Sequence, residues 1–173
     1  MNWSEDHCLQ DHIVYLALSS GLKVGVTRST QVPTRWIDQG ARKAIPLART
    51  PNRHLAGKIE VVLKAHMSDK TNWRNMLTNK IVRDVDLMEE KQKAVELLQA
   101  DLHQYVIQDK VVTEINYPVL QYPEKVNSLG FDKTKFIEGI LNGIKGQYLI
   151  FENGSVLNMS SKNGLVAEFG HAH

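Results

Sequence analysis

Short apolar runs separated by polar turns dominate the start of the chain. The run His12–Leu18 is rich in strand-forming residues and is followed by the turn signal Ser19-Ser20-Gly21. Apolar and polar residues then alternate over residues 22–26, so the pattern predicts two antiparallel strands joined by a tight turn. Gly25 removes a side chain from the second strand, and we expect another backbone or a ligand to approach the chain there.

Helical spacing replaces this alternation after the hairpin. Pro33 suits the first turn of a short helix, where its missing N–H costs nothing, and Pro46 keeps the next strand at an edge or a bulge. Asn52 is a suitable N-cap for a longer helix whose apolar residues recur at helical spacing. The predicted elements are helices over residues 34–41, 53–67 and 71–77 and a strand over residues 44–50.

The second half of the chain begins with the clearest helical pattern and ends in strand patterns. Asp86 and Glu89 have the spacing of a capping box, and they open a helix predicted over residues 87–108. Further along, Asn153-Gly154 and Asn163-Gly164 are strong signals for hairpin turns. Strands are predicted over residues 111–120, 136–144, 148–151, 156–159 and 165–169.

The order of these elements predicts an α+β fold. We expect an α/β unit over residues 1–85 and a long connecting helix over residues 86–110. Several short strands with regular turn signals then predict a small β sheet or barrel over residues 111–173.

Charge is distributed very unevenly between these parts. Residues 20–83 contain thirteen Lys or Arg against three Asp or Glu, a net charge of +10, whereas the remaining chain has 8 basic and 16 acidic residues, a net charge of −8. Such asymmetry favours a polyanionic partner, above all nucleic acid, bound through its phosphates. The residues expected to contact it are Lys23, Arg28, Arg42, Lys43, Arg53, Lys58 and Lys64.

Composition argues against several other classes of protein. No apolar run approaches the roughly 18 residues that a membrane-spanning helix needs, so no membrane partner is expected. The N-terminus is polar and acidic, unlike a secretory signal, and Cys8 is the single cysteine, so we expect a cytoplasmic protein. The sequence contains no P-loop and no GxGxxG fingerprint.

Four features of the basic unit follow one another in a distinctive order. Tyr15 lies on the first predicted strand, Lys23-Val24-Gly25-Val26-Thr27 on the second, Arg35 on the first helix and Glu60 on a later helix. This arrangement resembles the GIY-YIG nuclease module, whose short hairpin carries two motifs and whose helices supply an arginine and a glutamate. The resemblance covers about residues 12–79 and implies a GIY-YIG-like fold for the basic unit.

The resemblance also implies an activity, metal-dependent hydrolysis of phosphodiesters. Glu60 would hold one Mg²⁺ or Mn²⁺ ion. Tyr15 would accept a proton from the attacking water, and Arg35 together with Arg28 would bind phosphate oxygens. Lys23 stands where the nuclease pattern prefers a second tyrosine, and the first motif contains no glycine.

Longer segments resemble a second family, the uncharacterised prokaryotic family DUF2797. The resemblance rests on Thr34-Arg-Trp-Ile-Asp-Gln-Gly-Ala41, Asp69-Lys-Thr-Asn-Trp-Arg74 and Gly146-Gln-Tyr-Leu-Ile150. It extends over the whole chain and implies no activity.

Other interpretations of the same residues remain open. The chain is either a nuclease-like enzyme, a catalytically silent module that binds nucleic acid or protein, or a binder of a small anionic ligand. Tyr15 in an apolar strand is also typical of a core residue with a satisfied hydroxyl. Glu60 precedes Lys64 by four positions, which is the spacing of an ordinary ion pair on a helix surface.

Overall fold

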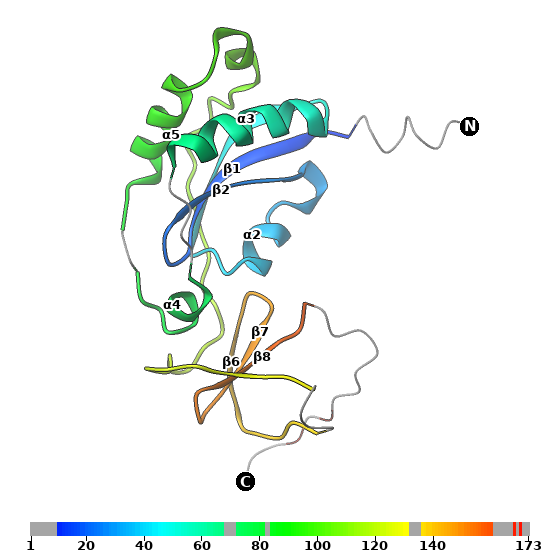
Figure 1. Ribbon diagram of the computed structural model, residues 1–173, viewed down its shortest axis with the longest axis vertical. Helices are drawn as coiled ribbons and strands as arrows, with labels where there is room; N and C mark the ends of the chain where they lie inside the picture. Colours follow the sequence, from blue (N-terminus) through cyan, green and yellow to red (C-terminus); the bar gives the residue numbers. More distant parts are fainter. Residues whose placement is uncertain are drawn as a thin grey trace, which may run out of the picture.

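Two small sheets and a few helices make up the protein. The computed structural model describes residues 10–67, 72–81, 84–131 and 136–160, together with residues 168 and 170. Its elements form two four-stranded sheets, which follow one another along the long axis of the molecule (Figure 1). The predicted mixed α+β class is therefore confirmed. Within the described residues, no helix is long and apolar enough to cross a membrane.

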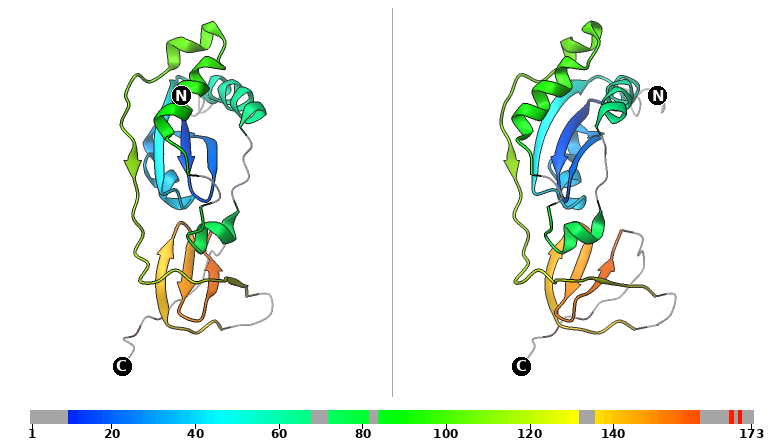
Figure 2. Two further views of the ribbon diagram at one scale, coloured as in Figure 1. Left: turned by 90° about the vertical axis from the view of Figure 1, so that its left-hand side faces the viewer. Right: turned by 60° about the vertical axis from the view of Figure 1, so that its left-hand side comes forward.

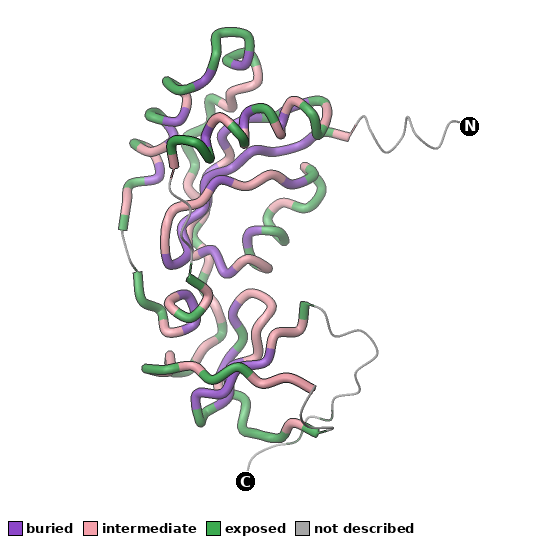
Figure 3. Tube along the Cα trace, viewed as in Figure 1, coloured by how far each residue is buried: buried purple, intermediate pink, exposed green. Residues whose placement is uncertain are grey.

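The first sheet is built around a completely buried central strand. Strand β1 (His12–Leu18) pairs antiparallel with β2 (Leu22–Arg28) on one side and with β3 (Lys43–Thr50) on the other. The two-residue β4 (Thr113–Glu114) extends β3, which gives the order β2-β1-β3-β4. All seven residues of β1 are buried because helices cover both faces of the sheet (Figure 3). The predicted hairpin is confirmed.

The two faces of this sheet meet different helices. One face packs its apolar residues with α3 (Arg53–His66) and α5 (Leu87–Glu96), and the other packs with the short α2 (Thr34–Asp38) through Trp36 (Figure 1). The residues of β1 alternate accordingly: Val14, Leu16 and Leu18 belong to the first cluster, and Ile13, Tyr15 and Ala17 to the second.

Local sequence signals set several element boundaries. The Asn52 side chain accepts a hydrogen bond from the backbone N–H of Leu55 at 2.9 Å, as expected for the N-cap of α3. Pro46 lies opposite Tyr15, next to a shift in the β1–β3 register, so the predicted irregularity is present inside the sheet. The Asp86 side chain caps α5 through the N–H of Met88.

The predicted continuous helix over residues 87–108 is wrong. Helix α5 ends at Glu96, and a 3₁₀ segment η2 (Ala100–Tyr105) follows it. The chain turns so that Leu98 and Leu102 enter the main apolar cluster, and Val106 then forms a bridge with Ala48. A straight helix would carry these side chains away from the core. Their burial against the sheet therefore outweighs the helical propensity of the segment.

The second sheet is open and mixed rather than closed into a barrel. It contains β5 (Asn127–Leu129), β6 (Leu141–Lys145), β7 (Tyr148–Phe151) and β8 (Ser155–Asn158) in the order β5-β8-β7-β6. Strand β5 is parallel to β8, whereas the other pairs are antiparallel.

Several predicted strand boundaries in this half differ from the structure. The strand expected over residues 111–120 is reduced to β4, and the one expected over residues 136–144 begins only at Leu141. The predicted Asn153-Gly154 turn joins β7 to β8, with Gly154 at a φ of 79°. The turn at Asn163-Gly164 and the strand over residues 165–169 lie outside the described residues, Glu168 excepted.

Helix α4 (Trp73–Leu77) links the two sheets in space. Its Met76 and Leu77 are buried with Ile150 and Val156 of the second sheet, although α4 ends fifty positions before that sheet begins in the sequence. Figure 2 shows from two further sides that α4 lies between the first sheet and the second. The junction between the sheets is therefore formed by α2, α4 and the β6–β7 hairpin.

Candidate functional site

Tyr15 lies at the centre of the first sheet, completely buried. Its hydroxyl donates a hydrogen bond to Gln39 Oε1 at 2.8 Å, and its ring packs against Trp36 with a centroid separation of 5.8 Å. Burial raises the pKa of Tyr15 to about 12, and the nearby charge of Arg35 and the hydrogen bond with Gln39 offset this only in part. Glu60 also contributes to the increase, so Tyr15 lies within electrostatic range of both other predicted catalytic residues.

Arg35 lies in a cleft at the junction of the two sheets. The cleft has a volume of about 300 Å³ and is lined by residues from β2, α2, α4 and the β6–β7 hairpin. We call it the Arg35 cleft. Its lining residues are Ser19, Lys23, Arg35, Asp38, Gln39, Asn72, Trp73, Met76, Gln147, Tyr148 and Asn158. The cleft thus brings Lys23 and Arg35 together with Gln39, whose side-chain oxygen accepts the hydrogen bond of the Tyr15 hydroxyl.

Two aromatic rings form part of the wall of the Arg35 cleft. Trp73 of α4 and Tyr148 of β7 lie nearly parallel, with an interplanar angle of 5° and ring centroids 5.8 Å apart. Both side chains are half-buried, and the Arg74 guanidinium lies 4.3 Å from the Trp73 ring centroid. Such cation–π contacts stabilise the position of an indole ring. The wall therefore combines a stacked aromatic pair with amide side chains and two cations.

Glu60 does not line the Arg35 cleft, and its carboxylate is held by two cations on α3. Lys64 Nζ lies 3.2 Å from one carboxylate oxygen, and Arg53 Nη2 lies 3.2 Å from the other. The helix-surface pair with Lys64 is therefore confirmed. A resident metal ion fits this arrangement poorly, because it would have to displace one of these cations. Within the described ranges, no three His, Cys, Asp or Glu side chains gather as a metal site.

The remaining basic residues predicted to bind nucleic acid divide into two groups. Arg28 at the end of β2, and Arg53, Lys58 and Lys64 on α3, are exposed and lie outside the Arg35 cleft. Arg42 and Lys43, at the start of β3, instead line a second pocket.

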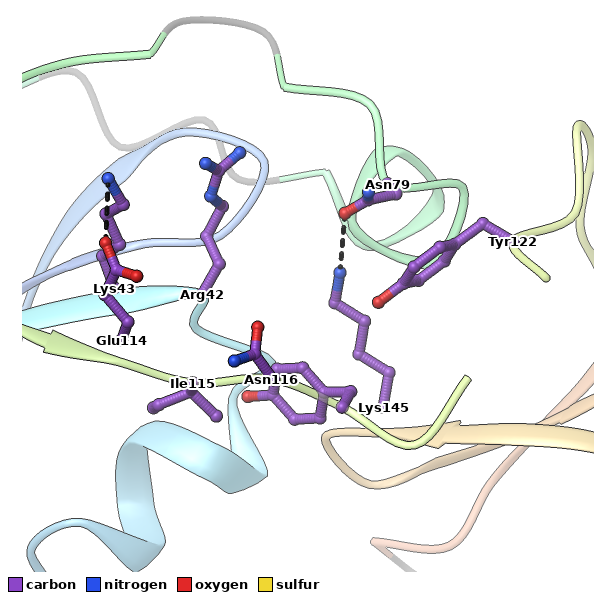
Figure 4. A pocket seen from close by; sticks show the side chains of 9 residues that line it. Arg42, Lys43, Asn79, Glu114, Ile115, Asn116, Tyr122 and Lys145 are labelled. Carbon is purple, nitrogen blue, oxygen red and sulfur yellow. Dashed lines mark hydrogen bonds and ion pairs between the residues drawn. The ribbon is translucent and has the colours of Figure 1, made fainter. Parts of the chain in front are cut away.

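This second pocket surrounds a lysine that sequence analysis did not identify. It has a volume of about 340 Å³, and we call it the Lys145 pocket (Figure 4). Its lining residues are Arg42, Lys43, Asn79, Glu114, Ile115, Asn116, Tyr117, Tyr122 and Lys145. Lys145 is only 3% exposed, and its Nζ lies 3.3 Å from Asn79 Oδ1. Burial and the nearby charge of Arg42 lower the pKa of Lys145 to about 8.

Two tyrosines form the aromatic side of the Lys145 pocket. Lys145 Nζ lies 4.7 Å from the ring centroid of Tyr122 and 5.6 Å from that of Tyr117. The Tyr117 hydroxyl donates toward the carbonyl oxygens of Ala41 and Ile37, at 2.9 and 3.0 Å, and burial raises its pKa. The sequence gives little signal for Lys145, because a lysine near a hairpin turn is typically solvated.

Comparisons with known proteins identify a family and no characterised relative. Neither the comparison with curated proteins nor the one with solved structures gives a match. A family model matches residues 1–167, nearly the whole chain. The chain belongs to the family described as protein of unknown function (DUF2797).

Proposed function

We propose that this protein binds single-stranded nucleic acid and that the Arg35 cleft holds one nucleotide of the strand. The observation that carries the proposal is the combination of Lys23 and Arg35 with the parallel pair of Trp73 and Tyr148 in one cleft. Proteins that bind single strands combine cations along the backbone with aromatic rings on which bases stack.

The other side chains of the cleft support a nucleotide rather than a bare anion. Gln39, Asn72, Gln147 and Asn158 line the cleft, and amide groups both donate and accept hydrogen bonds, as base edges require. Asp38 lines the cleft as well and is an acceptor suited to a base amino group or a ribose hydroxyl. A volume of about 300 Å³ lies at the lower end of the range for ligand sites.

Exposed cations outside the cleft would add phosphate contacts to this proposal. Arg28, Lys58 and Lys64 are exposed on β2 and α3, and the basic segment that contains them carries a net charge of +10. Phosphate contacts of this kind release counterions and make binding strongly dependent on salt. We therefore expect affinity to come from many cations and base contact to come from the cleft.

Binding of labelled single-stranded oligonucleotides, followed by fluorescence anisotropy over a range of salt concentrations, tests the proposal. Arg35→Gln should weaken binding about tenfold at low salt and reduce the steepness of the salt dependence by about 0.7, the contribution of one phosphate contact. The matched control is Arg49→Gln, which removes the same charge from an exposed side chain paired with Asp11. Equal effects of the two substitutions would contradict a nucleotide site in the cleft.

Phosphodiester hydrolysis by a GIY-YIG-like site is a second candidate. The order of the elements favours it, because Tyr15 lies on the central strand, Arg35 on the first helix and Glu60 on the next. Arg35 and Glu60 also both act on the pKa of Tyr15 through their charges. The ion pairs of Glu60 and the buried, protonated Tyr15 hydroxyl weigh against it, because a base must accept a proton.

A cleavage assay tests the second candidate directly. Purified protein and its Glu60→Ala variant are incubated with plasmid, single-stranded DNA and RNA in the presence of Mg²⁺ or Mn²⁺. Cleavage that disappears in the variant would support the nuclease-like function. Absence of cleavage, or cleavage that survives the substitution, would leave nucleic-acid binding as the proposed function.

A further inference from the structure

The Lys145 pocket presents a buried cation to an open cavity. Lys145 is 3% exposed, and its amine contacts the rings of Tyr117 and Tyr122 and the neutral side-chain oxygen of Asn79. A buried ammonium group is costly unless a counter-charge or several hydrogen bonds compensate it. The pocket thus holds a positive charge that a single amide oxygen satisfies only partly.

A second cation faces the same cavity. Arg42 lines the pocket and acts on Lys145 as a like charge. Figure 4 shows the side chains of Arg42 and Lys145 extending in the same direction from two sides of the pocket, with Asn116 between them in this view. Two like charges around one cavity destabilise each other until an anion lies between them.

Glu114 is the carboxylate that lines the pocket among the residues the structure describes, and it is already paired. Glu114 Oε1 lies 3.3 Å from Lys43 Nζ, at the edge of the pocket. Among the described residues, neither Arg42 nor Lys145 has a carboxylate within ion-pair distance. Within the described part of the chain, the Asn79 oxygen and the Tyr117 and Tyr122 rings face Lys145 but no carboxylate pairs with either cation, so an anionic ligand would supply the counter-charge.

We propose that the Lys145 pocket binds the phosphate group of a small phosphorylated molecule, with Lys145 and Arg42 as its cationic contacts. A phosphate monoester carries a charge close to −2 at neutral pH and has three acceptor oxygens, which suits two cations and an amide that approach from different sides. The rest of the molecule lies against Tyr122 and Ile115, and the 340 Å³ volume suits a small ligand.

This site is separate from the one proposed for nucleic acid. The Lys145 pocket and the Arg35 cleft share no lining residue. Gly40 is in close contact with Met76, which lines the Arg35 cleft, and with Gly146, which follows Lys145 in the sequence. A phosphate in the Lys145 pocket has two conceivable sources, a free small molecule and a nucleic-acid backbone, and experiment distinguishes them.

Isothermal titration at pH 7 tests the proposal with inorganic phosphate, pyrophosphate and nucleoside monophosphates, with acetate as the singly charged control. The protein is expected to bind at least one phosphate compound, and Lys145→Met and Arg42→Gln should each weaken that binding about tenfold or more, the loss of one charged contact. The control Lys93→Met removes an exposed lysine from α5, outside both candidate sites, and should leave binding unchanged.

A second measurement keeps the test decisive if Lys145→Met fails to fold. The lysines of the protein are ¹³C-methylated, and the Lys145 resonance, assigned as the signal absent from the Lys145→Arg spectrum, should shift and titrate at higher pH when phosphate binds. No binding up to about 10 mM, or no response of Lys145, overturns the proposal. The proposal is also overturned if Lys145 is needed for the binding of oligonucleotides but not for the binding of any small phosphate compound. Failure of the nucleic-acid proposal is detected separately, through the effect of Arg35→Gln on oligonucleotide binding.

Discussion

Gly146 contacts the backbone of Asp38: a β-carbon placed on Gly146 would lie 2.8 Å from the Asp38 carbonyl oxygen. The tip of the β6–β7 hairpin is therefore in direct contact with the end of α2. Both candidate sites depend on this contact, because Lys145 lies on one side of Gly146 and Gln147 on the other.

We expect Gly146→Ala to destabilise the protein by about 2 kcal/mol. The new methyl group would meet the Asp38 carbonyl, and the φ of 58° at Gly146 is unfavourable for a residue with a β-carbon. Urea unfolding followed by circular dichroism measures the change. The control is Gly57→Ala within α3, where helix propensity should give a small gain in stability. Equal stability of Gly146→Ala and the unmodified protein would contradict the close contact.

Tyr15 and Gly25 should be strongly coupled. A β-carbon on Gly25 would lie 2.6 Å from Cζ of the Tyr15 ring, so Gly25→Ala should cost about 1–3 kcal/mol by overpacking. Tyr15→Leu shortens the side chain and should remove most of this penalty in the double variant. A double-mutant cycle in urea unfolding measures the coupling free energy. Additive effects of the two substitutions would show that the ring does not cover Gly25.

Lys145 should make stability depend on pH above neutrality. Its pKa is about 8 in the folded protein and 10.5 ordinarily, so between these values the unfolded chain binds the proton and the folded protein does not. Stability should therefore rise with pH above about 8. Below pH 8, Lys145 is protonated in both the folded and the unfolded state, so the free-energy cost of burying its charge is constant. The expected gain is roughly 1–2 kcal/mol between pH 7.5 and pH 9.5, less than the full shift because the site relaxes.

The Lys145→Met variant isolates this effect in urea unfolding over the same pH range. The variant should lack the rise, since Arg42 stays charged and the tyrosines of the pocket, Tyr117 and Tyr122, have raised pKa values and remain neutral. Lys43 and Glu114, at the pocket edge, are present in both proteins and cancel in the comparison. The same rise in both proteins would mean that Lys145 is solvated.

Local signals predicted the elements of the first sheet well. The Ser19-Ser20-Gly21 turn and the Asn52 cap each act over a few residues, and each has its expected consequence in the structure. Gly25 does make room for a close approach, but by the Tyr15 ring and not by the backbone or ligand that was predicted. Helix α5 shows where this kind of inference fails. Its end is set by the burial of Leu98 and Leu102 against a distant sheet, and no nearby residue marks that boundary.

The candidate sites were predictable only in part, for a related reason. The basic segment identified Lys23, Arg35 and Arg42 as cations, but the two pockets form where α2 meets α4 and the β6–β7 hairpin. These elements are far apart in the sequence. The burial of Lys145 results from that contact between the two halves, and its own neighbours in the sequence do not indicate it.

Substitution of Glu60 tests whether its carboxylate serves in the ion pairs of α3 or as a metal ligand. Since the exposed side chains of Arg53 and Lys64 pair with both of its oxygens, Glu60→Gln should lower stability by less than about 1 kcal/mol, and added salt should reduce the difference. Mn²⁺ at about 10 mM should raise the melting temperature of the unmodified protein and of Glu60→Gln by the same small amount. The control is Glu90→Gln, which breaks a similar surface pair with Lys93 on α5. A different outcome is that Mn²⁺ stabilises the unmodified protein and Glu90→Gln but not Glu60→Gln. This would mean that the ion displaces a cation from Glu60, and it would supply the metal ligand that the nuclease-like interpretation needs.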